Sequence, residues 1–231
     1  MTSVASTIHA EVAPGVILDS RRALIHVRKR WMALADVHYG YEVHRSRQGA
    51  LLPKWGMQQC GETLFSLIDD YQPQRLILVG DIMDGSFSAA ETGLFLDQLR
   101  ERVPELILVE GNHDRPALRR GWSLIRSHCE EGFFFTHGHE GIAPPSMDIE
   151  PRFSPSSLIA ITGHEHPAIS LTDGAGLRLK LPALIQQQCS QHREHWILPA
   201  FSPWAAGGRF QPSSTVLATW ACTAKRVWKI V

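Results

Sequence analysis

Short apolar runs recur along the first two thirds of the chain, and each is four or five residues long. Runs of this length, bounded by polar residues or glycine, are typical of buried strands. They occupy residues 32–35, 76–79, 106–109, 133–136 and 158–162. Longer amphipathic stretches separate the first three runs. The pattern therefore predicts strand, helix, strand, helix, strand, with parallel pairing of the strands.

The amphipathic stretches carry apolar side chains at helical spacing. Residues 57–71 predict one crossover helix, and Pro73 prevents its continuation into the next strand. Residues 88–103 predict a second crossover helix with an apolar inner face. A third helix is expected to begin at Pro116 and to continue to about residue 127, because proline early in a helix loses no hydrogen bond.

Strand patterns fill the two ends of the chain. Residues 16–35 predict an antiparallel meander that leads into the first parallel strand. Beyond residue 166, a hairpin is expected to join residues 168–172 to residues 177–181. Further strands are expected at residues 183–188, 194–198 and 226–231. We therefore predict a single α/β domain over residues 1–231, with βαβ units in front and mostly strands behind.

Two segments lack a regular period. Residues 39–56 are expected to form a loop at one rim of a site, with Arg45 and Arg47 among aromatic residues. Such a loop either contacts phosphate and base or sugar groups, or packs on itself at the surface. Residues 141–157 contain four prolines and are too long for a plain connector. We expect them to form a second rim or a lid.

Composition restricts the kinds of partner. Lys plus Arg equals Asp plus Glu at 23 each, so no global positive field attracts nucleic acid, and any DNA contact must be local. The four cysteines show no paired spacing and are expected to be reduced thiols. No leader pattern and no run of ~18 apolar residues is present. We expect a soluble cytoplasmic protein without a membrane partner.

Ligand-type side chains follow each of the five apolar runs. The segments are Asp36-Val37-His38, Asp81-Ile82-Met83-Asp84, Asn112-His113-Asp114, Thr136-His137-Gly138-His139 and Gly163-His164-Glu165-His166. The carboxyl ends of strands in open α/β sheets are where sites gather. A single histidine after a strand is more often structural, and a single aspartate can simply cap a turn. Recurrence after five strands favours one shared site.

The order D-x-H, G-D-x-x-D, G-N-H-D, T-H-G-H, G-H-x-H resembles the calcineurin-like metallophosphoesterase superfamily, and all five blocks occur in the family's order. Within that superfamily, residues 34–40, and residues 198–201 before Gly207-Gly208, look like the bacterial DNA-ligase-associated phosphoesterases, which are relatives of the SbcD nucleases. The resemblance implies a four-layer sandwich of two mixed β-sheets flanked by helices.

Position by position, the resemblance implies two divalent ions that share Asp81. The implied ligands of the first ion are Asp36, His38, Asp81 and His166, and those of the second are Asp81, Asn112, His137 and His164. Carboxylate, amide oxygen and imidazole suit Mn²⁺, Fe²⁺ or Zn²⁺, and we expect Mn²⁺. Two such ions would lie ~3.5–4 Å apart and share a hydroxide, the expected nucleophile. His139 and Glu165 are expected beside the ligands or at the rim.

The remaining residues of the blocks have other expected roles. His113 is free to act as a general acid toward the leaving oxygen. Asp84 matches the family position that orients this histidine, and we expect the two to form a hydrogen bond. Asp114 is expected to fix its loop through backbone hydrogen bonds. The candidates for contacts with substrate phosphate groups are Arg45, Arg47 and Arg115.

The sequence thus predicts a dinuclear metal-dependent phosphoesterase that hydrolyses phosphodiester bonds by in-line attack of a metal-bound hydroxide. The narrower resemblance favours a DNA-processing nuclease in repair, with DNA ligase or repair proteins as partners. Two alternatives stay open: a small-molecule phosphodiesterase or phosphomonoesterase, and a non-catalytic metal-bearing interaction protein. His113 and the full set of ligand types argue against the second alternative.

Overall fold

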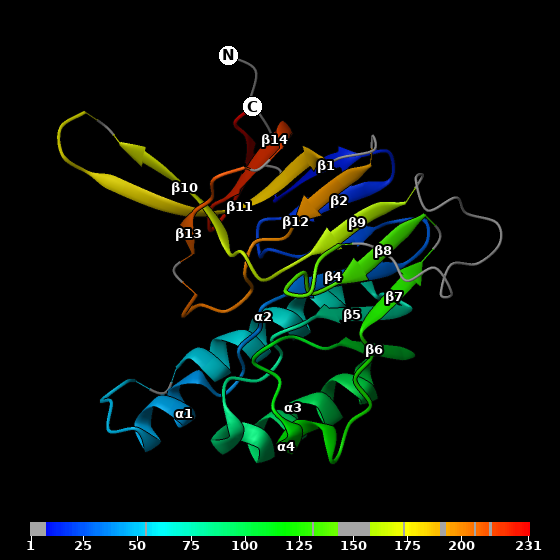
Figure 1. Ribbon diagram of the computed structural model, residues 1–231, viewed down its shortest axis with the longest axis vertical. Coiled ribbons are helices and arrows are strands. Elements are labelled where there is room, and N and C mark those ends of the chain that lie inside the picture. Colours follow the sequence, from blue (N-terminus) through cyan, green and yellow to red (C-terminus); the bar gives the residue numbers. More distant parts are fainter. Residues whose placement is uncertain are drawn as a thin grey trace.

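Two β-sheets pack face to face, and helices cover the outer side of the first sheet (Figure 1). The computed structural model describes residues 8–53, 55–130, 132–142, 158–172, 174–189, 193–205, 207–212 and 214–231. No helix in these ranges is long and apolar enough to cross a membrane. The predicted α/β class, with two mixed sheets flanked by helices, is confirmed.

The first sheet has the strand order β1-β2-β3-β4-β5-β6. Its strands are β1 (His9–Ala13), β2 (Val16–Asp19), β3 (Leu24–His26), β4 (Trp31–Ala35), β5 (Arg75–Val79) and β6 (Glu105–Val109). Pairing is antiparallel from β1 to β4 and parallel from β4 to β6, which confirms the meander and the crossover pattern. Ala35 pairs with Val79 and Val79 with Val109, so the parallel strands end at one edge.

The described helices are α1 (Tyr41–Arg47), α2 (Gly56–Tyr71), α3 (Ala89–Arg102) and α4 (Pro116–Arg119), and the 3-10 turn η1 (Ser86–Ser88) precedes α3. α2 and α3 confirm the two predicted crossover helices. The predicted loop over residues 39–56 is wrong where α1 forms, because seven residues are too few for a visible period. The third helix ends at Arg119 instead of continuing to residue 127. Beyond Gly121 the chain returns to the first sheet, where Ile125 bridges Val109.

The second sheet has the path β13-β10-β11-β12-β9-β8-β7, with β14 paired to β11 and β15 paired to β14. Its strands are β7 (Ser127–Glu130), β8 (Phe133–Thr136), β9 (Ile159–Thr162), β10 (Pro167–Thr172), β11 (Arg178–Gln188), β12 (Glu194–Ile197), β13 (Gly208–Arg209), β14 (Thr215–Cys222) and β15 (Val227–Lys229). The strands predicted on either side of Pro182 form one strand, β11. β1, β7, β13 and β14 are additions to the prediction. Of the segment 141–157, residues 143–157 lie outside the described residues.

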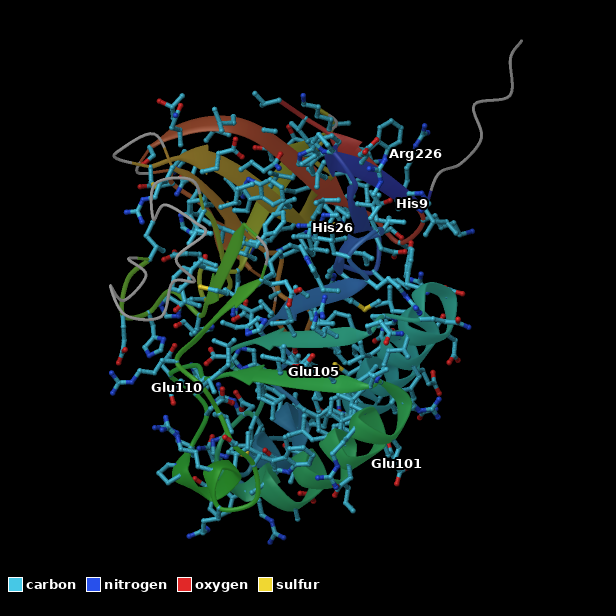
Figure 2. The ribbon with its side chains drawn as sticks, turned by 90° about the vertical axis from the view of Figure 1, so that its right-hand side faces the viewer. His9, His26, Glu101, Glu105, Glu110 and Arg226 are labelled. Carbon is cyan, nitrogen blue, oxygen red and sulfur yellow. The ribbon has the colours of Figure 1, made fainter. Side chains whose placement is uncertain are left out.

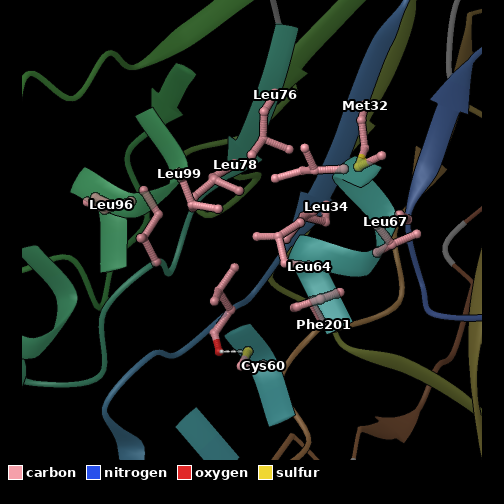
Figure 3. Packing of buried hydrophobic residues seen from close by; sticks show 14 of the residues in the cluster. Met32, Leu34, Cys60, Leu64, Leu67, Leu76, Leu78, Leu96, Leu99 and Phe201 are labelled. Carbon is pink, nitrogen blue, oxygen red and sulfur yellow. Dashed lines mark hydrogen bonds between the residues drawn. The ribbon is translucent and has the colours of Figure 1, made fainter. Parts of the chain in front are cut away.

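One hydrophobic core lies between the helices and the first sheet. Leu64 and Leu67 of α2 and Leu99 of α3 pack against the sheet face that carries Leu34 and Leu78 (Figure 3). Cys60 of α2 belongs to the same cluster, and its Sγ lies 3.9 Å from the carbonyl oxygen of Val37. Each fully buried leucine stabilises this packing by about 1.5–3 kcal/mol. The core fixes the position of α2 and α3 beneath the parallel strands.

A second core lies between the two sheets. Trp31 of β4 is fully buried there and contacts the rings of Phe133 and Phe135 edge to face, with centroids 5.1 and 5.3 Å away. Trp196 of β12 packs against Phe133 from the same side of the second sheet. The side view shows the helices, the first sheet with Glu105 at the start of β6, and the second sheet in successive layers (Figure 2). This core holds the ends of the two sheets together.

Candidate metal centre

Side chains from both sheets meet at the carboxyl ends of the parallel strands. Asp36 follows β4, Asp81 follows β5 after Gly80, and His137 follows β8 directly. An isolated bridge between Ala35 and Ala200 joins the end of β4 to the chain beyond β12. The structure brings together all seven residues that the sequence indicated as ligands: Asp36, His38, Asp81, Asn112, His137, His164 and His166.

The first cluster contains Asp36, His38, Asp81 and His166, each with a ligand atom within 4.8 Å of the others. Nε2 of His166 lies 3.3 Å from Oδ1 of Asp36, and Nε2 of His38 lies 3.7 Å from Oδ2 of Asp81. The two Nε2 atoms of His38 and His166 are only 3.4 Å apart. These four side chains therefore converge on one point.

The second cluster contains Asp81, His137 and His164. Nε2 of His137 lies 3.3 Å from Oδ2 of Asp81 and 3.1 Å from Oδ1 of Asn112. Asp81 belongs to both clusters, so its carboxylate stands between them. Carboxylate, amide and imidazole ligands on two adjoining points fit a pair of divalent ions with Asp81 as the bridge.

The backbone carries several of these side chains in the left-handed region. Five of the residues have positive φ: Asp36 (55°), His38 (45°), Asp81 (47°), His164 (72°) and His166 (44°). Such angles are uncommon outside glycine and cost on the order of 1 kcal/mol or more each. Gly80, which precedes Asp81, also has φ of 74°, and a Cβ at this position would collide with the His137 ring. The loops are therefore strained and closely packed where the side chains converge.

The buried acids of the two clusters favour the binding of cations. Asp36 and Asp81 are 0% and 2% exposed, and within the described ranges no Lys or Arg forms an ion pair with either. Burial alone would raise the pKa of Asp81, but its interactions with His137 and His38 hold that pKa well below its usual value. Burial opposes protonation of His38 and His137, yet nearby carboxylates raise both pKa values. Buried acids without a basic partner are well suited to bind cations.

Backbone groups and a second carboxylate orient the ligand rings. Nδ1 of His137 lies 3.2 Å from the carbonyl oxygen of Val79, and Nδ1 of His38 lies 3.2 Å from Oδ1 of Asp84. If each Nδ1 carries the proton, each Nε2 is left free to face the cluster, as is usual in metal sites. The His164 N–H donates to both carboxylate oxygens of Asp36, at 3.0 and 3.2 Å.

Asp114 fixes the neighbouring loops as expected. Its Oδ1 accepts hydrogen bonds from the N–H groups of Ile82 and Met83 at 2.9 and 3.0 Å, and its Oδ2 accepts one from Gly111 at 2.8 Å. Burial raises the pKa of this carboxyl to about 6. The loop after β6 is thereby joined to the loop after β5.

The expected hydrogen bond between Asp84 and His113 is not formed. Oδ1 of Asp84 is 3.9 Å from Nδ1 of His113, which is beyond hydrogen-bond reach. The same oxygen makes its short contact with Nδ1 of His38. His113 stands close by, with its side chain 45% exposed and its ring centroid 5.1 Å from that of His38. Asp84 therefore orients a residue of the first cluster, and His113 is left open toward solvent.

A pocket of about 220 Å³ opens beside the first cluster, and one of the three candidate arginines lines it. Its lining includes His113 and His166 together with Arg45 of α1. Arg47 and Arg115 are exposed and do not line it. His139 lies beside the second cluster, with its ring centroid 5.3 Å from that of His137, whereas Glu165 is exposed at the rim.

Tyr41 and Trp204 also line this pocket. Tyr41 belongs to the segment 39–56, whose aromatic residues were expected at the rim, whereas the sequence did not indicate Trp204 as a site residue. Their rings stack with centroids 5.6 Å apart, and Arg45 lies over Tyr41 at 5.1 Å. The Trp204 indole N–H donates to the buried carboxylate of Glu42 at 3.0 Å. The one sequence signal was the position of Trp204 shortly after the segment 198–201.

The fold and the two Asp/His clusters are those of a metallophosphoesterase. The sequence matches the calcineurin-like phosphoesterase family over residues 30–227. The chain therefore belongs to the calcineurin-like phosphoesterase family, which defines a hydrolase of phosphoesters that uses a pair of divalent metal ions.

Two solved structures are similar to this chain. The nuclease MPE of Pseudomonas putida superposes with a TM-score of 0.63 at 19% identity, over 93% of this chain and 94% of that chain. The phosphoesterase Yfce of E. coli gives a TM-score of 0.44 at 13% identity, over 87% of this chain and 97% of that chain. A search of curated protein sequences finds no significant match. At these identities the likeness to solved structures concerns the fold.

Proposed function

We propose that the protein is a dinuclear metal-dependent phosphodiesterase that acts on DNA, with Mn²⁺ as its working ion. The observation that carries this proposal is the shared Asp81, which lies in both ligand clusters. Two divalent ions at these points would polarise the phosphoryl group and activate water for in-line attack. Asp36, His38 and His166 are assigned to one ion, and Asn112, His137 and His164 to the other.

His113 is the proposed general acid. It belongs to neither ligand cluster that contains Asp81, and it faces the pocket next to His38 and His166. A protonated imidazole in this position can give its proton to the leaving oxygen as the P–O bond breaks. Oδ1 of the Asp84 carboxylate lies 3.9 Å from its Nδ1.

DNA is proposed as the substrate because of what lines the pocket. Tyr41 and Trp204 offer aromatic faces on which an unstacked base can lie, and Arg45 supplies a local positive charge beside them. Arg47 and Arg115 are proposed as further contacts with backbone phosphates. The nuclease MPE of Pseudomonas putida, which has a similar fold, agrees with this choice of substrate. A role in repair beside a DNA ligase follows as part of the same proposal.

The test uses purified protein with Mn²⁺ on four substrates in parallel: single-stranded DNA, duplex DNA, a chromogenic phosphodiester and a chromogenic phosphomonoester. We expect cleavage of DNA and of the chromogenic diester. Trp204→Ala should reduce DNA cleavage more than hydrolysis of the chromogenic diester, because only DNA offers a base to stack. Activity on the monoester alone, or equal losses on both diesters, would contradict the DNA assignment.

A further inference from the structure

A second cavity lies beside the segment 200–204. Phe201 and Pro203 line this cavity, whereas Ser202 and Trp204 line the pocket beside His113. Its volume is about 390 Å³, within the range of ~300–1,000 Å³ that is usual for small-molecule sites. It is bounded by α2, by the turn between β2 and β3, and by parts of β11 and β14. None of these lining residues has a role in the proposed hydrolysis.

The lining of this cavity is rich in hydrogen-bond donors and contains no Asp or Glu among the described residues. Its members with polar side chains are Ser20, Arg21, Arg22, Gln59, Thr63, Lys180 and Thr223, together with the thiols of Cys60 and Cys222. Arg21 is already neutralised, because its guanidinium pairs with Asp19 at 2.8 Å and with Asp70 at 2.7 Å. The uncompensated charges are those of Arg22 and Lys180.

Arg22 presents an unused side of its guanidinium. Its Nη1 donates to three backbone carbonyl oxygens, those of Ala200, Phe201 and Ser202, at 3.1, 3.4 and 3.1 Å. Its Nε and Nη2 groups have no partner among the residues that the structure describes. Nε and Nη2 form the edge of arginine that holds an oxyanion with two parallel hydrogen bonds.

The charge of Arg22 is also poorly compensated. Burial lowers the pKa of its guanidinium, and no carboxylate among the described residues offsets that effect. Arginine nevertheless stays protonated in proteins, so a cation is held in a half-buried place without an anion from the described chain. Buried charges are normally paired, and an incoming anion would supply the missing partner.

We propose that this cavity binds the phosphate group of a small anion, either free phosphate or a phosphorylated metabolite. The phosphate lies against the Nε and Nη2 edge of Arg22, with Lys180 as the second cation. The Lys180 ammonium now contacts the carbonyl oxygen of Gly207 and lies at the cavity wall. Gln59 and Thr63 of α2 supply neutral donors, and Phe201 and Pro203 form an apolar surface for the rest of a larger ligand.

Occupancy of this cavity is connected to the metal centre through the backbone. Two of the three carbonyl groups that Arg22 contacts belong to residues whose N–H groups bond to β4 and its following loop. Phe201 N–H donates to Ala35 at 2.8 Å, and Ser202 N–H donates to the carbonyl oxygen of Asp36 at 3.0 Å. An anion on Arg22 is therefore expected to steady the segment that supports Asp36 and carries Trp204.

The test measures binding of inorganic phosphate and of adenosine 5′-monophosphate to the full chain by isothermal titration calorimetry, before and after removal of metal with a chelator. Chelation removes the ions at the metal centre that would otherwise bind phosphate. We expect one phosphate site to remain after chelation. Lys180→Ala and Arg22→Lys should each weaken it by about tenfold or more, since each removes a charge-assisted hydrogen bond.

Arg28→Ala is the matched control, because Arg28 is an exposed cation in the turn between β3 and β4 and lies outside the cavity lining. This variant should bind phosphate like the unaltered chain. Lys180→Ala changes an exposed side chain, so it tests the proposal even where an Arg22 variant does not fold. Loss of all phosphate binding on chelation, or equal affinity in Lys180→Ala and Arg28→Ala, would overturn the proposal. Neither outcome depends on whether the chain cleaves DNA.

Discussion

The two sheets contribute different chemistry to one centre. Loops of the first sheet bring the acids Asp36 and Asp81, which are almost completely buried. Loops of the second sheet bring only imidazoles, those of His137, His164 and His166, and the side chain of His166 is 25% exposed. Both carboxylates thus come from the first sheet, which also brings His38 and Asn112, whereas the second sheet adds imidazoles alone. A cation bound between them would join the sheets, so metal binding and sheet packing should support each other.

The largest expected effect comes from removing the negative charge that both clusters share. Asp81→Asn should lose both ions and lower the rate of hydrolysis by at least about 10³-fold, because the bridging carboxylate no longer neutralises two cations. Elemental analysis and a diesterase assay measure the two losses. Glu165→Gln is the control, since it removes one exposed charge beside the ligands. Two ions per chain in Asp81→Asn would remove Asp81 from the bridging position.

A variant of His113 should lose catalysis while both sheets keep their metal ligands. His113→Ala should lower kcat by about 10²–10⁴-fold, the usual range for a positioned proton donor, with both ions still bound. The defect should be smaller for a nitrophenyl leaving group than for an alkyl one, because a stable anion needs little protonation. Equal defects for both leaving groups would show that His113 acts on the phosphoryl oxygens or on substrate position.

The two sheets orient their ligand histidines in different ways, and Asp84 takes part in only one of them. His38 is oriented by the side chain of Asp84, whereas His137 is oriented by the backbone carbonyl of Val79. Asp84→Asn should therefore weaken ion binding at the first cluster by about 10–100-fold and leave the second cluster unchanged. Titration with a competing chelator resolves the two ions. Unchanged affinity at both clusters, with kcat lowered as in His113→Ala, would make His113 the effective partner of Asp84.

His195 tests the stability of the second sheet at acid pH and should have the smallest effect on activity. This β12 histidine bonds to Thr162 and Gln187, and burial lowers its pKa to about 4. The unfolded chain, with a pKa near 6.5, binds more protons between these values. The neutral ring therefore contributes up to about 3 kcal/mol to the free energy of unfolding. This contribution is complete above pH ~6.5 and is lost as the pH falls toward 4.

Urea unfolding at several pH values, for the unaltered chain and for His195→Gln, measures this contribution of His195. The difference between the two proteins cancels the part of the pH dependence that comes from the metal ligands. We expect the free energy of unfolding to fall less steeply below pH 6.5 in the variant. Identical slopes would mean that folding does not lower the pKa of His195.

The order of the ligand-bearing loops could be predicted from the sequence because each follows a local signal. An apolar run such as 76–79 identifies its own strand, and parallel pairing in register brings the ends of β4, β5 and β6 together. The helices α2 and α3 also carried their period within their own residues. The ligand-type residues of the loops could be recognised for the same reason, because each group directly follows its own apolar run. Their roles as metal ligands stay a prediction.

Other features depend on contacts between distant parts of the chain. Trp204 meets Glu42 across 162 residues, and no local pattern around either residue indicates the pair. The choice of Asp84 between His38 and His113 depends on the packing of three loops. α1 is too short to show a period, and β11 continues through Pro182 because its other residues pair with β10, β12 and β14. Such features follow from tertiary packing.

The left-handed backbone at the ligands has a consequence for the order of events when an ion arrives. Hydrogen bonds within the protein help to hold these loops, because the His164 N–H donates to Asp36 and the His113 N–H donates to Oδ1 of Asp81. Part of the conformational cost of the site is therefore met when the chain folds. We expect that one folded chain can be unloaded and reloaded with different cations without passing through an unfolded state.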